Sequence, residues 1–214
     1  MKIQQSTSPS FQAIKLSVAN IKGIKPKQSI ELYSLDKFDI DFAKKYLKDF
    51  NLVALYPNEK SYLDFDIWER FITGAFNKIG EQNVILATHK NKPCGIMSFS
   101  EKEQEIYLNY LAKWRPAANM DISYVGKVLM HHLFDTANKK LALNISCIAS
   151  LCSPRQKSCK DFYAQLGFRR SANNSMNLFG ADYAKKAKDL ENFFEYKALE
   201  TPTIVDSNKE FIIL

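Results

Sequence analysis

The sequence predicts an α/β domain with a mixed, mostly antiparallel sheet flanked by helices, an N-terminal arm and a C-terminal helix–strand extension. Two observations predict the sheet. Strand-like segments at 83–90, 94–100 and 106–114 follow one another with short turns, which indicates an antiparallel meander. A helix, a strand and a second helix come next, which indicates a parallel crossover. The 46% hydrophobic content of 214 residues is sufficient for a real core. We expect an arm at 1–29, a domain at 30–180 and the extension at 181–214.

The expected arm is strongly basic. Residues 1–30 contain five lysines and no acidic residue, so they account for most of the net charge of +7. A short strand is expected at 11–18 within it. The arm is interpreted either as a solvated leader or as a contact for an anionic partner. Nucleic-acid binding is not favoured, because the chain has neither zinc-finger spacing nor an aromatic RNA-binding signature.

Apolar spacing defines the elements of the first half. A strand is predicted at 30–35, and helical periodicity predicts helices at 42–50 and 68–79, the second ended by Gly80. The three strands of the meander follow, with a turn at 91–93. On the third strand, alternation is expected to place Tyr107, Asn109 and Leu111 on one face.

The second half continues with alternating helices and strands. A helix is predicted at 124–137, with His132 on its apolar face, as a crossover between parallel strands at 106–114 and 143–151. A helix ending at Gly167, a hairpin at 169–179, a helix at 182–199 and a last strand within 203–214 complete the chain.

Several classes of function are excluded or disfavoured. No apolar run reaches the roughly 20 residues of a membrane-spanning helix, and the N-terminus lacks a signal-peptide pattern, so we expect a cytoplasmic protein. The four cysteines form no C-x-x-C pair, and three histidines are too few for a metal site, so no metal is expected. Cys147 alternates with apolar neighbours and is interpreted as a buried residue rather than a nucleophile.

Four segments carry a family resemblance, namely CGIMSFS (94–100), the strand ending in LAKW (111–114), YVGKVLMHHL (124–133) and FYAQLGF (162–168). Their order and separation resemble the GNAT superfamily of acyl-CoA-dependent N-acyltransferases over residues 30–180. The resemblance implies a GNAT-like sheet that splays between its two parallel strands. It also implies acetyl-CoA as co-substrate.

The resemblance implies positions for coenzyme A. The pantetheine arm would pair with the backbone of Leu111, Ala112 and Lys113. The pyrophosphate would meet the backbone N–H groups of the helix start, because a helix N-terminus favours anions; these residues are Ser123, Tyr124, Val125, Gly126 and Lys127. Lys127 is equally interpreted as a solvated helix lysine. The usual phosphate loop has Arg or Gln where this chain has Asp121 and a middle glycine where it has Tyr124, a residue that adopts positive φ only at a cost.

Two side chains are candidates for catalysis. Tyr163 lies where the resemblance implies a general acid for the departing thiolate, although a tyrosine on this helix face also fits core packing. The family often has a glutamate on the central strand. The strand predicted at 106–114 contains no acid and has Tyr107 and Asn109 as polar candidates. Glu105, at the strand start, is ranked first ahead of Glu103, with a solvent-exposed turn carboxylate as the alternative. Lys160, with Arg155 and Lys157, is either a contact for the 3′-phosphate of coenzyme A or part of a solvated face.

The function expected from this combination is transfer of an acetyl group from acetyl-CoA to a primary amine of a small molecule or a protein. The alternative is a catalytically silent acyl-CoA-binding or protein-interaction module on the same fold. The amine acceptor is not readable from the sequence, no membrane partner is expected, and a homodimer is compatible with the C-terminal extension.

Overall fold

The computed structural model describes residues 13–35, 74–75, 77–90, 92–113, 122–148, 156–171 and 175–204. Their strands are β1 (Ile14–Ile21), β2 (Ser29–Leu35), β3 (Asn83–His89), β4 (Lys92–Lys102), β5 (Glu105–Lys113), β6 (Asn144–Ile148), β7 (Arg169–Arg170), β8 (Ser175–Phe179) and β9 (Phe194–Ile204). Their helices are α4 (Val125–Lys139), α5 (Gln156–Gln165) and α6 (Tyr183–Leu190). The helix expected at 42–50 and most of the one expected at 68–79 lie outside the described residues.

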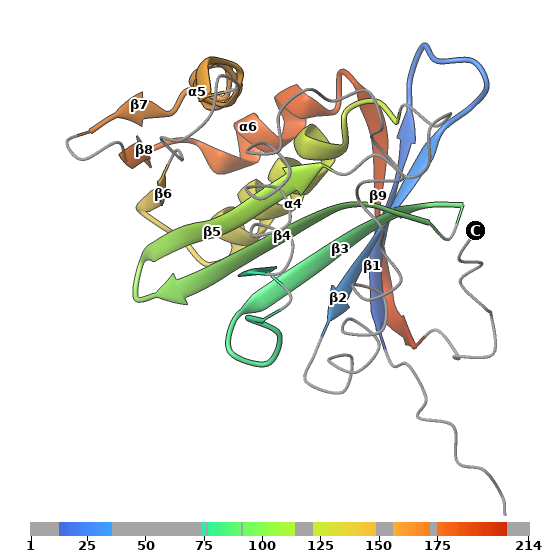
Figure 1. The fold of residues 1–214 in the computed structure, drawn as a ribbon, viewed down its shortest axis with the longest axis horizontal. Coiled ribbons are helices and arrows are strands. Elements are labelled where there is room, and N and C mark those ends of the chain that lie inside the picture. The colour runs from blue at the N-terminus through green and yellow to red at the C-terminus, as the bar shows by residue number, and fades with distance from the viewer. Residues whose placement is uncertain are drawn as a thin grey trace, which may run out of the picture.

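The strands form one mixed sheet in the order β7-β8-β6-β5-β4-β3-β2-β1-β9 (Figure 1). Among the described pairs β5–β6 is parallel and the others are antiparallel. The predicted meander is confirmed as β3–β4–β5, and α4 is the predicted crossover from β5 to its parallel neighbour β6. The expected fold class is therefore confirmed.

The two flanking segments of the chain meet at one edge of this sheet. The strand expected at 11–18 is observed as β1, which pairs with β2 on one side and with β9 on the other. Lys15, one of the arm lysines, forms an ion pair with Glu31 of β2 at 2.5 Å. Strand β1 of the expected arm and strand β9 of the expected extension thus belong to the sheet, while the boundaries of the domain stay a prediction.

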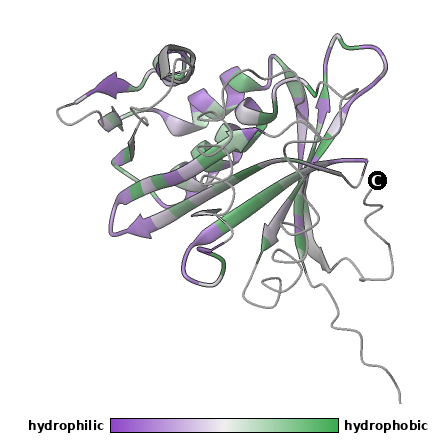
Figure 2. Cartoon of the chain, viewed as in Figure 1, coloured by the Kyte–Doolittle hydropathy of each residue, from purple (hydrophilic) through white to green (hydrophobic). Residues whose placement is uncertain are grey.

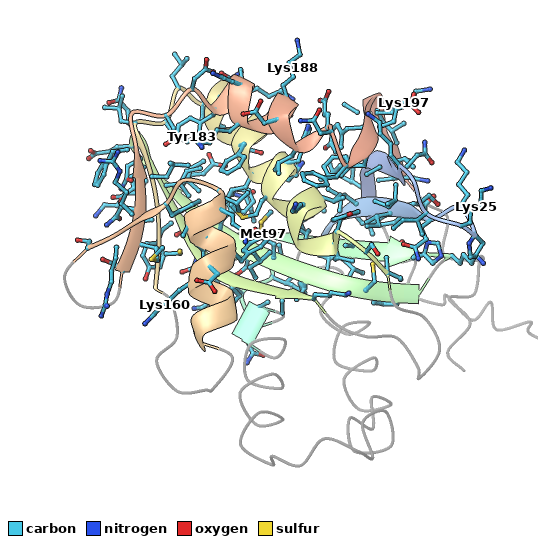
Figure 3. The ribbon with its side chains drawn as sticks, turned by 90° about the horizontal axis from the view of Figure 1, so that it is seen from above. Lys25, Met97, Lys160, Tyr183, Lys188 and Lys197 are labelled. Carbon is cyan, nitrogen blue, oxygen red and sulfur yellow. The ribbon has the colours of Figure 1, made fainter. Side chains whose placement is uncertain are left out.

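Helix α4 is covered on two sides. One side packs on the sheet strands, and the opposite side packs on α6, so that sheet, α4 and α6 form successive layers (Figure 3). Its buried residues accordingly extend around the helix and include Met130, His131, Phe134 and Ala137. His131 is only 3% exposed, whereas His132, which the apolar stripe predicted to be the buried one, keeps intermediate exposure. The second covering layer, which a single-stripe pattern does not reveal, explains the difference.

The helix predicted at 182–199 is wrong beyond Leu190. Asp182 caps α6 by accepting a hydrogen bond from the Lys185 N–H at 2.9 Å, and the helix ends at Leu190. Phe194, one turn beyond Leu190, fits helical spacing but begins β9. The period-two alternation of Phe194, Glu195 and Tyr196, buried, exposed and half-buried, is the signal that predicts a strand there.

The core lies between the sheet and α4. Strand β3 is buried from Val84 to His89 and is hydrophobic along most of its length (Figure 2). Gly95 of β4 lets α4 approach closely, because a Cβ there would lie 2.5 Å from Val125 Cγ1 and 3.1 Å from the Ala112 carbonyl oxygen. The sheet therefore fixes the start of α4, which is also the start of the expected phosphate site.

Candidate functional site

Strands β5 and β6 part in the middle of β5. Their parallel pairing runs from Glu105–Asn144 to Leu108–Cys147. Strand β5 continues to Lys113, paired with β4 on its other side. Among the described residues, the pairing of β6 with β5 does not extend beyond Leu108. The resemblance implies that the two strands splay beyond this point and that Leu111, Ala112 and Lys113 meet the pantetheine arm, and the end of the described pairing at Leu108 and Cys147 is compatible with that prediction.

A β-bulge at Asn109 marks the point where β5 leaves β6. Phe99 pairs with Leu108 and Ser98 pairs with Tyr110, so Asn109 is an extra residue in β5. Bulges bend a strand and increase its twist. The Asn109 side chain donates a hydrogen bond to Gln82 Oε1 at 2.9 Å. Its position gives a local cause for the splay.

The bulge also corrects an expectation about β5. Leu108 pairs with Phe99 and Leu111 pairs with Met97, and Met97 and Phe99 lie two residues apart on one face of β4. Leu108 and Leu111 therefore share a face, and Tyr107 and Leu111 do not, contrary to simple alternation. A polar asparagine within an apolar strand is the only sequence signal for this bulge.

Tyr163 lies on α5, beside the last pair of β5 and β6. Its side chain hydrogen-bonds the thiol of Cys147, the residue that pairs with Leu108. The ring contacts Phe162 and Phe168, each with ring centroids 5.4 Å apart. The side chain is half-buried. Tyr163 therefore both packs against two aromatic rings and places its hydroxyl beside the end of the described β5–β6 pairing.

The turn after α5 holds Tyr163 in place. Gly167 has φ +91°, and the Phe168 N–H returns to the Tyr163 carbonyl oxygen at 3.0 Å. Cys147 is not a reactive thiolate here. Burial raises the pKa of its thiol to about 12, and the hydrogen bond from Tyr163 lowers it by less. This agrees with its interpretation as a buried residue.

The start of α4 presents backbone donors. The N–H groups of Val125, Gly126 and Lys127 make no hydrogen bond to the described part of the chain. Ser123 differs, because its N–H donates to Gln28 Oε1 at 3.1 Å. Gln28 belongs to the β1–β2 loop, far away in sequence, and nothing in the sequence points to this contact. The first turn of α4 therefore offers the donor geometry of an anion site.

Tyr124 takes the left-handed conformation that a glycine would adopt without strain. Its φ and ψ are 62° and 14°, and its side chain makes no capping hydrogen bond. The ring lies 5.0 Å from the ring of Phe193, between centroids. Phe193 follows α6, so the C-terminal segment packs directly on the turn that precedes α4.

Lys127 lies in the same cluster. Its Nζ is 3.2 Å from the Phe193 ring centroid and 5.3 Å from the Tyr124 ring centroid, which are cation–π distances. Partial burial lowers the pKa of Lys127. Its expected alternative, a solvated helix lysine, fits this packing less well. The aromatic contact with Phe193 was not foreseen, because it joins residues of two distant segments.

Glu105 lies at the other end of β5. Its Oε1 accepts hydrogen bonds from Asn144 at 2.8 Å and from Ser146 at 2.9 Å, both on β6. At about 3.3 Å per residue, Leu111 is roughly 20 Å further along the strand. A general base must reach the amine directly or through one water. This geometry favours a structural role for Glu105, whose catalytic role stays a prediction.

Lys160 does not join the cluster at the start of α4. It projects from the side of α5 that is turned away from α4 and α6 (Figure 3). The side chains of Arg155 and Lys157 lie outside those that the structure describes.

Among the described residues, no group of three or more His, Cys, Asp or Glu side chains is arranged to hold a metal ion. No described helix combines the length and apolarity needed to cross a membrane.

Comparison with known proteins gives matches at the level of structure. No family model and no curated protein sequence matches the chain. The structure of PaiA N-acetyltransferase from Thermoplasma acidophilum with coenzyme A is 15% identical, covering 70% of this chain and 98% of that one, with a TM-score of 0.47. A GNAT-family acetyltransferase from Staphylococcus aureus is 13% identical (70% and 98% covered, TM-score 0.45). Tetrahymena GCN5 is 14% identical (64% and 87% covered, TM-score 0.43).

Proposed function

We propose that the protein is an acyl-CoA-dependent N-acyltransferase that moves an acetyl group from acetyl-CoA to a primary amine. The observation that carries the proposal is the end of the described β5–β6 pairing at Leu108 and Cys147, where the Tyr163 side chain hydrogen-bonds Cys147. The expected splay of the two strands begins at this point. The start of α4, with its free N–H groups, lies at the end of the connection that follows β5. This combination suits a ligand with an anionic centre and an arm of amide groups.

The proposed binding mode uses backbone on both sides. The pantetheine amides pair with the backbone of β5 between Leu111 and Lys113, beyond the last described pair of β5 with β6. The pyrophosphate accepts hydrogen bonds from Val125, Gly126 and Lys127 at the positive end of the helix dipole. The Ser123 N–H is already engaged with Gln28 and is not needed.

The proposed reaction is direct transfer. The neutral amine nitrogen attacks the thioester carbonyl carbon, and a backbone N–H of β5 stabilises the oxyanion. The C–N bond forms, the C–S bond breaks, and Tyr163 donates its phenolic proton to the departing sulfur. The attacking nitrogen loses its extra proton to solvent, and solvent returns a proton to the Tyr163 phenolate, so that the products are the amide and the free thiol of coenzyme A. This scheme does not require Glu105, whose catalytic role stays a prediction.

The test combines binding with turnover. Acetyl-CoA is titrated into the protein by calorimetry, and release of free coenzyme A thiol is followed with a panel of amines. Tyr163→Phe is expected to lower kcat about 100-fold or more, the scale of a positioned general acid, with little change in acetyl-CoA affinity. Tyr33→Phe is a matched control, because Tyr33 hydrogen-bonds Glu31 on β2, remote from the splay.

A binding module without turnover is the second candidate. It is favoured by the described part of β5 beyond the bulge, whose polar side chains are those of Tyr110 and Lys113 and include no carboxylate. Binding of acetyl-CoA without thiol release from any amine would support this candidate. Absence of acetyl-CoA binding would contradict both. The acceptor amine and homodimer formation stay predictions.

A further inference from the structure

A pocket of about 270 Å³ lies between α4, α5 and α6, beside the start of α4. Helix α6 lies outside the part of the chain that resembles the acyltransferases. Phe162 both lines this pocket and contacts the first turn of α4, because a Cβ on Gly126 would lie 3.3 Å from Phe162 Cζ. The pocket therefore begins where the proposed pyrophosphate site ends.

Two lysines line this pocket. Lys127 comes from α4 and Lys186 from α6, and neither forms an ion pair with the described residues. Lys186 Nζ lies against the end of α5, where a Cβ on Gly167 would approach it to 2.6 Å. Gly167 thus leaves room for the ammonium group. Two lysines on the wall of one pocket favour a doubly charged anion such as a phosphate monoester.

The remaining wall suits a planar ring. Phe162 and Phe193 provide aromatic surface, and Leu166 and Leu190 provide aliphatic surface. Gln165 and Asp189 are the polar groups without positive charge on the wall. Asp189 would repel a phosphate next to it, but its carboxylate can accept a hydrogen bond from an exocyclic amino group such as that of adenine. The adenosine 3′-phosphate end of coenzyme A carries both a phosphate monoester and a purine ring.

We propose that this pocket binds the adenosine 3′-phosphate end of coenzyme A, with Lys186 of the C-terminal helix as the residue that selects the 3′-phosphate. The inference rests on the proposed function, because it requires the pyrophosphate at the start of α4. It assigns the 3′-phosphate to Lys186 and Lys127 rather than to Lys160, which projects away from this pocket.

The experiment compares coenzyme A with 3′-dephospho-coenzyme A by calorimetry on the full chain. The wild type is expected to bind coenzyme A about tenfold more tightly or better, as charge-assisted hydrogen bonds allow. Lys186→Gln is expected to bring this ratio close to one by weakening coenzyme A alone, and Lys186→Arg to restore it. Adenosine 3′,5′-bisphosphate, which lacks the thiol arm, should follow the same pattern.

Lys188→Gln is the matched control, because Lys188 lies on the same helix, is exposed and projects away from the protein (Figure 3). It is expected to keep the wild-type ratio. A wild type that binds both forms equally, or a ratio lost in Lys160→Gln and kept in Lys186→Gln, overturns the inference and leaves the proposed function standing. A wild type that binds neither form contradicts the proposed function, and this inference with it.

Discussion

At the scale of single residues, Tyr124 holds a backbone conformation that is unfavourable for its type. A left-handed residue other than glycine costs about 1–2 kcal/mol. Its ring contacts Phe193 and Lys127, both of which lie at the proposed coenzyme A site. The chain thus combines a strained turn with an aromatic contact that holds it, where the family resemblance implies a glycine.

We expect Tyr124→Gly to be more stable than Tyr124→Ala by about 1 kcal/mol, because both lose the ring and only alanine keeps the strain. The free energies of unfolding of the two variants, measured in urea, test this difference. Equal stability, or a more stable alanine variant, would show that position 124 does not require positive φ.

His132 gives a prediction on pH. His132 keeps part of its surface exposed, but the protein packed around its ring, opposed by the charge of Asp135, lowers its pKa to about 4, and the unfolded value is near 6.5. Between these values the unfolded chain binds the proton more readily. Stability is therefore complete above about pH 6.5 and is lost as the pH falls toward about 4.

The melting temperature between pH 7 and pH 4 checks this expectation. His132→Asn lacks the group and should show a shallower fall than the wild type over this range. The other groups that interact with the His132 ring are His131, Lys139 and the Tyr196 hydroxyl at 3.5 Å, and they are the same in both proteins. Parallel curves for the two proteins would show that His132 does not contribute to the acid sensitivity.

At the scale of elements, the contact of β4 with α4 sets the position of the site. Gly95→Ala introduces a Cβ 2.5 Å from Val125 Cγ1 and is expected to destabilise the protein by about 1–3 kcal/mol, the cost of overpacking a core. Because Val125 opens α4, the shift should also weaken acetyl-CoA binding. Urea unfolding and calorimetry measure the two effects.

The Val125→Ala variant tests whether a collision between the side chains at positions 95 and 125 causes the loss of stability. If the two side chains collide, the double variant is less destabilised than the sum of the single variants. Strict additivity would place the origin of the effect elsewhere, for example in the 3.1 Å approach to the Ala112 carbonyl oxygen.

At the scale of the whole molecule, the C-terminal segment is part of the folding unit. Phe194, the first residue of β9, is fully buried in the main core cluster. Phe194→Ala is expected to cost about 3–5 kcal/mol, as for other buried phenylalanines. Phe179→Ala is a matched control, because Phe179 is 70% exposed and its loss should change stability by about 0.5 kcal/mol or less.

Unfolding in urea, followed by tryptophan fluorescence and by circular dichroism, measures both variants. One transition with coincident midpoints is expected. An earlier separate transition, or an unchanged stability in Phe194→Ala, would mean that β9 and α6 are an appendage that folds independently.

Local periodicity predicted the meander, the crossover α4 and the turn at Gly167, because each depends on neighbours in sequence. Local periodicity gave wrong predictions where contacts between distant segments determine burial or the end of a helix. His131 is buried because α6 and β9 cover the second side of α4, and Leu190 ends a helix although Phe194 continues its spacing. Of the site, Tyr163 and the donors of α4 were predicted. The Asn109 bulge, Gln28, Phe193 and Lys186 were not, because strand register and tertiary contacts place them.

The pairing of β1 with β9 has a consequence for synthesis of the protein. The register joins Ile14 to Ile204, so β1 leaves the ribosome long before its outer partner exists. At about 5–20 residues per second, the interval between Ile21 and Phe194 lasts on the order of 10–30 s. During this time the edge of β1 that later pairs with β9 has no partner strand, so it can pair with a strand of another nascent chain on the same polysome. We therefore expect the yield of soluble protein to fall when translation between β1 and β9 is slowed.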